Sequence, residues 1–216
     1  MKIIISPAKK MNIREDELEW ANLPCFLSRA EELKRYIQGL DLDQARKLWQ
    51  CNEKIALLNY GRFKEMDLER RLTPALLSYE GIQYQYMAPG VFEQGQWDYV
   101  QEHLRILSGF YGILKPLDGI VPYRLEMQAK VELPSGIKSL YDYWGSSICR
   151  ELAADETLIV NLASKEYSRA AEKYAGRETR FVTCIFGELL DGKVKVKGTM
   201  AKMARGEMVR WLSEKN

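Results

Sequence analysis

The residues of this chain best placed for chemistry lie between positions 103 and 127, in the segment HLRILSGFYGILKPLDGIVPYRLEM. Carboxylates, cations and tyrosines alternate there with apolar residues. Gly109 and Gly112 lack a Cβ atom, so the backbone can approach another segment or a ligand closely at these positions. Pro116 and Pro122 restrict φ and disfavour helical geometry in the preceding residue, so the chain turns sharply twice. The segment therefore predicts a rigid, polar site.

Acid–base chemistry at such a site requires side chains that gain and lose protons near a pocket. The candidates are Asp118, Tyr123, Arg124, Glu126 and Glu166. The single histidine, His103, lies in an expected amphipathic helix, where a partly exposed helix residue is favoured over a catalytic base. One histidine excludes sites built from several histidines and weakens Ser-His and Cys-His schemes.

The sequence carries no recognisable motif for a metal or a cofactor. Its four cysteines are Cys25, Cys51, Cys149 and Cys184, and no two of them form a CxxC pair. Zinc and iron–sulfur sites are therefore not expected, and buried structural thiols are favoured over a reactive Cys149. Neither a Walker loop nor a GxGxxG that follows a strand is present. We expect reduced thiols and a cytoplasmic protein without metal or cofactor.

Two loops that follow predicted strands combine hydroxyl and basic residues. The loop after the strand at 2–5 contains Ser6, Lys9 and Lys10, and the loop after the strand at 158–162 contains Ser164 and Lys165. A helix that begins after such a loop offers free N–H groups and a positive dipole end, which suit an anion. A solvated first loop, and an ordinary N-cap at Ser164, are the alternatives.

Positive charge is concentrated at the end of the chain. The whole sequence has a net charge of +2, whereas residues 193–216 carry seven cations and two glutamates, a net +5. Lys202 and Arg205 are three residues apart and share one face of the expected last helix. Such asymmetry marks either a face that meets phosphates or a solubilising tail.

The apolar spacing predicts a mixed α/β fold. We expect helices at 27–38, 41–58, 97–107 and 199–212, and a helix that follows the loop 163–164 and runs through 175. We expect strands at 2–5, 158–162, 181–186 and 194–197. Asp191-Gly192 predicts a hairpin turn. Strands and helices interleave without a regular βαβ period, so we expect a single domain over 1–216, with a mixed β-sheet core surrounded by helices. No apolar run approaches the roughly 20 residues of a membrane span.

Residues 37–49 fit a helix-hairpin-helix template, in which the N–H groups of the hairpin grip a phosphate without reading sequence. Asp41 stands where the template has its second glycine, and its carboxylate would repel a phosphate. Arg46 and Lys47 could partly offset that repulsion. An ordinary αα-hairpin with a capped second helix is the alternative.

Seven motifs spread over nearly the whole chain resemble those of the peroxide stress protein YaaA family. They are Ile5-Ser-Pro-Ala-Lys9, Asn59 with Arg62-Phe63, the run from His103 to Asp118, Pro122-Tyr-Arg-Leu-Glu-Met127, Leu140-Tyr-Asp-Tyr-Trp-Gly145, Asn161-Leu-Ala-Ser-Lys-Glu-Tyr167 and Ala201-Lys-Met-Ala-Arg-Gly206. The combination of SGFYGILKPLD with PYRLEM is the most specific part of the match.

The resemblance implies a cytoplasmic protein of the hydrogen peroxide response that limits damage from unincorporated iron. It also implies DNA binding through a basic cleft, and a fold peculiar to the family with a helix-hairpin-helix element. The candidate DNA- or ligand-binding residues are Ser6, Lys9, Lys10, Arg62, Arg105, Ser108, Gly109, Lys115, Arg124, Ser164, Lys165, Arg169, Lys202 and Arg205.

The chain departs from the family pattern at two places. Residues 79–87 read YEGIQYQYM, which lacks a basic and a small residue of the usual motif. Many members also continue beyond the Ala-Arg-Gly helix, whereas this sequence stops at Asn216, which puts in doubt any part of the cleft that such an extension would build.

Two functions from different classes follow from these residues. The first is a DNA-binding stress protein without enzymatic activity, which binds with little sequence preference. The second is an enzyme that acts on a nucleotide or a nucleic-acid base, at a pocket formed by the segment at 103–127. Direct ligation of iron is a third and weaker hypothesis, because no histidine or cysteine cluster is visible.

Overall fold

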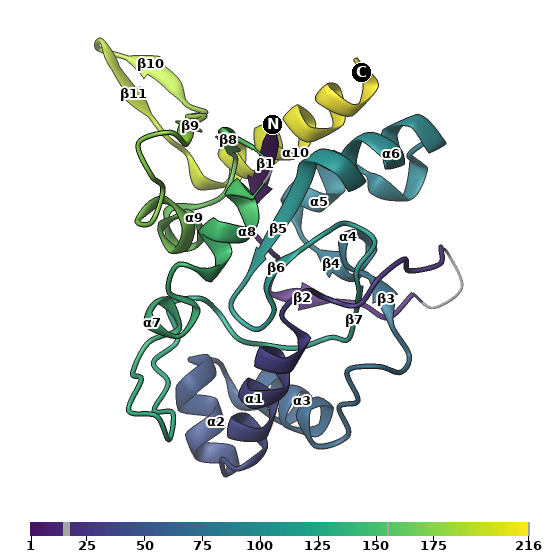
Figure 1. The fold of residues 1–216 in the computed structure, drawn as a ribbon, viewed down its shortest axis with the longest axis vertical. Coiled ribbons are helices and arrows are strands. Elements are labelled where there is room, and N and C mark those ends of the chain that lie inside the picture. Colours follow the sequence, from purple (N-terminus) through teal and green to yellow (C-terminus); the bar gives the residue numbers. More distant parts are fainter. Residues whose placement is uncertain (15–17, 155, 216) are drawn as a thin grey trace.

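A five-stranded sheet forms the centre of the computed structural model, which describes residues 1–14, 18–154 and 156–215 (Figure 1). The strands lie in the order β6-β5-β1-β8-β9. Their bounds are Gly112–Leu114, Leu104–Ser108, Lys2–Ile5, Leu158–Asn161 and Arg180–Thr183 in that order. β5, β1, β8 and β9 are parallel, and β6 pairs with β5 in the antiparallel sense. The predicted mixed sheet within a mixed α/β fold is confirmed.

The central strand β1 is buried on both of its faces. Ile3, Ile4 and Ile5 are 0% exposed, as expected for a parallel strand with a continuous apolar run. Ile3 pairs with Leu104 of β5 on one side and with Val160 of β8 on the other. Since the three strands are parallel, the chain leaves all of them at the same edge of the sheet.

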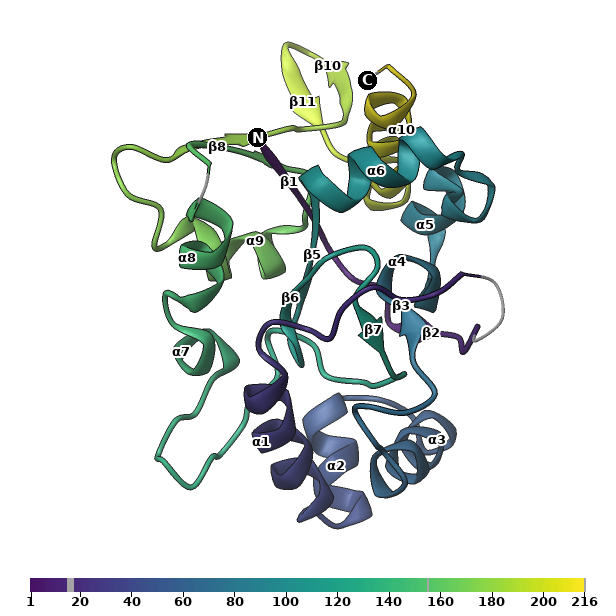
Figure 2. The ribbon, with the colours of Figure 1, turned by 45° about the vertical axis from the view of Figure 1, so that its right-hand side comes forward.

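Helices and short strands surround this sheet (Figure 2). The helices not described further below are α4 (Ala75–Ser78), η1 (Pro89–Val91), α7 (Leu140–Trp144) and α8 (Ser147–Ala153). Two small antiparallel pairs join β2 (Lys10–Met11) to β4 (Tyr79–Glu80) and β3 (Thr73–Pro74) to β7 (Gly119–Ile120). No helix within the described ranges is long and apolar enough to cross a membrane.

The helix predicted at 97–107 is wrong in its second half. α6 covers Gln94–His103, and β5 begins at the next residue. All five residues of β5 are buried, and periodicity cannot distinguish so short a buried strand from a helix. His103 is the last residue of α6, with its Nδ1 atom 2.9 Å from the carbonyl oxygen of Met1.

The predicted helix at 27–38 is confirmed as α1 (Leu27–Gln38), whereas the one predicted at 41–58 is two helices. α2 covers Leu42–Trp49 and α3 covers Glu53–Lys64. The chain breaks at Gln50, which has a left-handed conformation with φ 44°, and Asn52 then caps α3 by accepting the N–H of Ile55. These three helices form one end of the molecule (Figures 1 and 2).

The helix-hairpin-helix element is not confirmed, because the N–H groups of the turn are already occupied. The N–H of Gly39 donates to the carbonyl of Arg35, and that of Leu40 donates to Ile37. The N–H of Asp41 donates to the side chain of Gln44, whose own N–H donates to the Asp41 carboxylate. The segment is the alternative structure, an αα-hairpin with a capping box.

The predicted hairpin at Asp191-Gly192 is confirmed. β10 (Glu188–Leu190) and β11 (Lys193–Lys195) are antiparallel, and the two turn residues have φ values of 52° and 73°. Positive φ at both positions is typical of a type I′ turn. The strands predicted at 181–186 and 194–197 are thus shorter than expected, at Arg180–Thr183 and Lys193–Lys195.

Of the three remaining helices, α9 and α10 frame the carboxyl edge of the sheet. α9 covers Lys165–Glu172 and ends before the predicted residue 175, and α10 covers Gly198–Glu214. α10 packs along α5 (Ile82–Met87), as Figure 2 shows. A Cβ atom on Gly206 would lie 2.1 Å from the carbonyl oxygen of Gln83, so the two helix backbones are in direct contact.

This contact predicts opposite effects of the same substitution in two helices. In Gly206→Ala, the new methyl group must push α10 away from α5, and we expect the free energy of unfolding to fall by about 1–3 kcal/mol. In Gly61→Ala, the matched change in α3, nothing lies within 4 Å of the new Cβ. We expect that variant to gain up to about 1 kcal/mol from helix propensity. Urea denaturation measures both, and equal stabilisation of the two variants would contradict the α5–α10 contact.

Candidate functional site

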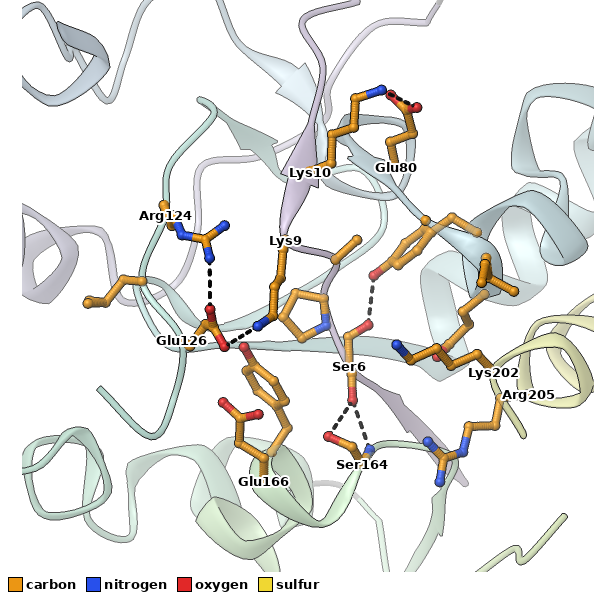
Figure 3. Close-up of a pocket in the computed structure, with 18 of the residues that line it drawn as sticks. Ser6, Lys9, Lys10, Glu80, Arg124, Glu126, Ser164, Glu166, Lys202 and Arg205 are labelled. Carbon is orange, nitrogen blue, oxygen red and sulfur yellow. Dashed lines mark hydrogen bonds and ion pairs between the residues drawn. The ribbon is translucent and has the colours of Figure 1, made fainter. Parts of the chain in front are cut away.

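A cavity of about 430 Å³ lies at the carboxyl edge of β1 and β8 (Figure 3). It is lined by segments far apart in the sequence: Ser6, Pro7, Ala8, Lys9 and Lys10; Glu80, Gly81, Ile82, Gln83 and Tyr84; Tyr123, Arg124, Leu125 and Glu126; Ser164, Glu166 and Tyr167; and Lys202 and Arg205. In parallel α/β sheets, ligands bind outside the carboxyl ends of strands where the chain turns to opposite sides of the sheet. The boundary between β1 and β8 is such a position, because β1 is followed in the sheet by β5 on one side and β8 is followed by β9 on the other.

Two serines join the loops that follow β1 and β8. The Ser6 hydroxyl oxygen accepts the N–H of Ser164 at 2.8 Å and lies 3.2 Å from the Ser164 hydroxyl oxygen. The carbonyl of Ser6 accepts the hydroxyl of Tyr84 at 2.9 Å. Ser164 is the N-cap residue of α9, but its side chain makes no hydrogen bond to the first turn of that helix. These hydrogen bonds hold the two loops together as the floor of the cavity.

One wall carries a carboxylate shared by two cations. Glu126 lies 2.8 Å from the amino group of Lys9 and 3.2 Å from the guanidinium of Arg124 (Figure 3). Arg124 and Glu126 are mostly buried, with side chains 11% and 16% exposed. The second basic residue of the loop, Lys10, pairs with Glu80 at 2.5 Å. The hydrogen bond from Lys10 lowers the pKa of Glu80.

The opposite wall carries two cations without a carboxylate partner in the described part of the chain. Lys202 and Arg205 extend from α10 toward Ser6 and Ser164 (Figure 3). Burial lowers the pKa of Arg205, although a guanidinium stays charged at neutral pH. The Nε atom of Arg205 is buried and has no hydrogen-bond partner. The cavity therefore presents unneutralised positive charge on the side of α10.

Glu166 is the carboxyl group of the cavity best suited to gain a proton. Burial raises its pKa, and the negative charge of Glu126 raises it further. The N–H of Gln128 donates to it at 3.3 Å and acts in the opposite direction. Burial thus favours the neutral acid at Glu166, whereas Glu126 forms ion pairs with Lys9 and Arg124.

Tyr123 belongs to a buried hydrogen-bond network behind the cavity. Its hydroxyl lies 2.6 Å from the Ser108 hydroxyl oxygen and 2.8 Å from the Tyr79 hydroxyl. The Ser108 oxygen also accepts the N–H groups of Phe110 and Tyr111. Burial raises the pKa of Tyr123 to about 12, so it remains a neutral phenol at physiological pH. Ser108 thus supports the site without lining it.

At Gly109 the backbone closely approaches another segment, as the sequence predicted. A Cβ atom there would lie 2.5 Å from the carbonyl oxygen of Leu125. The end of β5 therefore packs directly on the segment that carries Arg124 and Glu126. Gly112, the other glycine singled out by the sequence, has φ +76° and packs its Cα against the Trp144 ring.

Other predicted site residues lie away from this cavity. Asp118, Arg105 and Lys115 line a separate cavity of about 190 Å³, together with Cys25 and Glu151. Arg62 donates to Asn59 and to the carbonyl of Met11, both at 3.4 Å. Lys165 and Arg169 belong to α9, where Arg169 lies over the Tyr141 ring. The structure therefore brings Ser6, Arg124 and Ser164 together and places Asp118 elsewhere.

Sequence reasoning missed the contribution of α5. Gln83 and Tyr84 line the cavity, and the Nε2 atom of Gln83 is buried without a partner. α5 has only six residues, too few for a reliable apolar period. The available signal was the family motif over residues 79–87.

The described residues contain no group of three or more histidine, cysteine, aspartate or glutamate side chains that could hold a metal ion. Burial raises the pKa of Cys149 and, to about 12, that of Cys25, so both are thiols rather than thiolates at neutral pH.

The fold and the site define a mixed α/β protein with a cation-rich cavity at the carboxyl edge of its sheet. Over residues 1–216, the sequence matches the family described as "Peroxide stress protein YaaA", and the chain belongs to that family. A UPF0246 protein of Desulfitobacterium hafniense (strain Y51) is 57% identical over 215 residues, which cover 100% of this chain and 85% of the relative. A UPF0246 protein of Lachnoclostridium phytofermentans is 54% identical over 214 residues, 99% of this chain and 84% of the relative.

The raised pKa of buried Asp118 predicts that the free energy of unfolding depends on pH. Burial raises its pKa from 3.8 to about 6, so the folded state favours the neutral acid, and stability is lost as pH rises between these values. Asp118→Asn keeps an acceptor for the Lys115 N–H, which lies 2.8 Å from the carboxylate, and it cannot ionise. We expect the variant to gain up to roughly 3 kcal/mol over the wild type between about pH 4 and pH 7.

Urea denaturation at both pH values measures this difference. Asp43→Asn, at an exposed aspartate of α2, is the control and should show no such gain. A constant difference between Asp118→Asn and the wild type across this pH range would contradict the prediction.

Proposed function

We propose that this member of the YaaA family is a cytoplasmic protein that binds DNA with little sequence preference, across the cationic mouth of the cavity. The observation that carries the proposal is the pair Lys202 and Arg205, which have no carboxylate partner in the described ranges and face the loop of Lys9 and Lys10. Cations from two segments on either side of an opening suit a phosphate backbone, whose contacts position a protein without reading bases.

We propose in addition that such binding limits iron-dependent damage to the DNA. Lysine and arginine contacts release the cations that condense on DNA phosphates. Ferrous ions among those cations would then leave the DNA surface. They would no longer react with peroxide beside the DNA. In this proposal, protection requires that the protein covers the DNA, and it does not require a metal site in the protein.

Charge reversal on α10 tests the DNA proposal. We expect the wild type to lose about tenfold or more in affinity for a random-sequence duplex between about 50 and about 200 mM salt. The double variant Lys202→Glu/Arg205→Glu should bind at least about tenfold more weakly, with a shallower dependence on salt. Fluorescence anisotropy of a labelled duplex measures both quantities.

A charge-matched control separates the site from overall charge. Lys54→Glu/Arg150→Glu makes the same change at exposed positions of α3 and α8, outside the cavity. Its affinity should fall much less than that of the α10 variant. Equal losses in the two variants would show that the bulk charge, and not this face, binds DNA.

Glu166 favours a second candidate function, an enzyme that acts on a nucleotide or a nucleic-acid base. Its raised pKa places a proton donor and acceptor in the cavity beside Arg124 and Tyr123. Incubation with DNA and with nucleotides, followed by mass spectrometry, should then reveal a product. Glu166→Gln should abolish that product and leave DNA affinity unchanged. Absence of any product from the wild type would reject this candidate and leave the binding proposal intact.

A further inference from the structure

Unsatisfied hydrogen-bond donors are concentrated among the residues that line the cavity. Among the described residues, four buried side-chain nitrogen atoms have no hydrogen-bond partner, and three of them belong to residues that line it. These three are Nε2 of Gln83, Nε of Arg124 and Nε of Arg205. The fourth, Nε1 of Trp49, belongs to a residue outside this lining, in a second, small cavity that Arg124 and Glu126 also line. Buried polar groups are rarely left without partners, so three of them among the residues of one lining leave hydrogen bonds for an occupant to complete. All three are N–H donors, so the occupant must supply acceptors.

The charge of the cavity makes that occupant an anion. The lining includes the cations Lys9, Lys10, Arg124, Lys202 and Arg205, and the carboxylates Glu80, Glu126 and Glu166. Glu80 and Glu126 are engaged by cations of the same lining, and the pKa of Glu166 is raised. With all three carboxylates ionised, the five cations leave a net charge of +2, and Lys202 and Arg205 are the two cations that have no carboxylate partner in the described ranges.

An independent source of positive potential lies beside these two side chains. α9 begins at Lys165, directly after Ser164 in the cavity floor, and runs for eight residues. The N–H of Ser164 donates to Ser6 and that of Tyr167 donates to the carbonyl of Ser164, so the first-turn N–H groups without a partner in the described ranges are those of Lys165 and Glu166. The positive end of the helix dipole beside them favours a phosphate. Figure 3 shows Arg205 and Lys202 reaching toward this corner from α10.

The cavity is larger than a bare phosphate requires. Its volume of about 430 Å³ falls within the range of about 300–1,000 Å³ typical of small-molecule sites. Beyond the cations, its lining includes Ile82 and the tyrosines at 84, 123 and 167. Apolar and aromatic surface of this kind accepts a planar heterocycle, and the Gln83 amide can hydrogen-bond its edge.

We propose that the cavity binds one phosphorylated nucleotide, with its phosphate between α10 and the start of α9. The nucleotide has two sources of the same chemistry, a free nucleoside monophosphate or the 5′-phosphorylated end of a DNA strand. Binding of a DNA end at this site rests on the proposed DNA binding, whereas binding of a free nucleotide does not depend on it.

Calorimetry with the wild-type chain tests the ligand class, with adenosine 5′-monophosphate, adenosine and inorganic phosphate as separate probes. We expect the monophosphate to bind at least about tenfold more tightly than either of the other two, since each lacks one half of the contacts. Competition between 5′-phosphorylated and 5′-hydroxyl duplexes then distinguishes the two sources. A preference for the phosphorylated end assigns the site to DNA ends, and its absence assigns it to the free nucleotide.

Gln83→Leu and Arg205→Gln test the residues. Each should weaken binding of the monophosphate by about tenfold, while the unliganded protein keeps or gains stability, because an unpaired buried donor has been removed. Trp49→Phe removes the fourth unpartnered N–H outside the cavity and should leave binding unchanged. Loss of affinity accompanied by an equal loss of stability in both variants would make these residues merely structural and overturn their assignment.

Two results separate this inference from the DNA proposal. Failure of the monophosphate to bind, together with equal affinity for both duplex ends, overturns the nucleotide site even where salt-dependent duplex binding persists. Equal affinity for inorganic phosphate and for the monophosphate would also overturn it. Saturable nucleotide binding without duplex binding would contradict the proposed DNA-binding function and would support the nucleotide site.

Discussion

β1 is hydrogen-bonded on both sides, to β5 and to β8, and its three isoleucines are completely excluded from solvent. This burial constrains everything at the carboxyl edge of the sheet. Because the three strands run in the same direction, Ser6, Ser108 and Ser164 all come to that edge, although up to 158 residues separate them. The hydrogen bonds between Ser6 and Ser164 then close the floor that the strand pairing has brought together.

Two glycines set the positions of the walls. At Gly109 the end of β5 touches the backbone at Leu125, and at Gly206 α10 touches the backbone of α5. A side chain at either position would move its wall outward. The wall beyond Gly109 carries the pair Arg124 and Glu126, and α10 carries Lys202 and Arg205. Backbone contact thus determines how far apart the opposing cations lie.

The sequence predicted local features well and the meeting of distant ones poorly. Capped helices, the Asp191-Gly192 turn and the apolar strands β1 and β8 have local causes, and the structure confirms them. β5 was missed because its identity as a strand depends on pairing with β1, about a hundred residues away. For the same reason Asp118 was placed with Arg124: proximity along the chain does not reveal that they face different cavities. Gln83 was missed because a six-residue helix carries almost no period.

The charges of the cavity are not arranged for stability alone. A fold selected only for stability would pair each cation with a carboxylate, as Lys10 pairs with Glu80, or would replace a buried cation by an apolar residue. Arg205 is instead half-buried, has no ion pair in the described ranges and keeps an unpartnered Nε atom. Local violations of this kind are expected at functional sites, where a ligand completes the interactions that the protein leaves open. Since the exception sits on α10 and faces the N-terminus of α9, the partner that we propose for it is an anion held between those two helices.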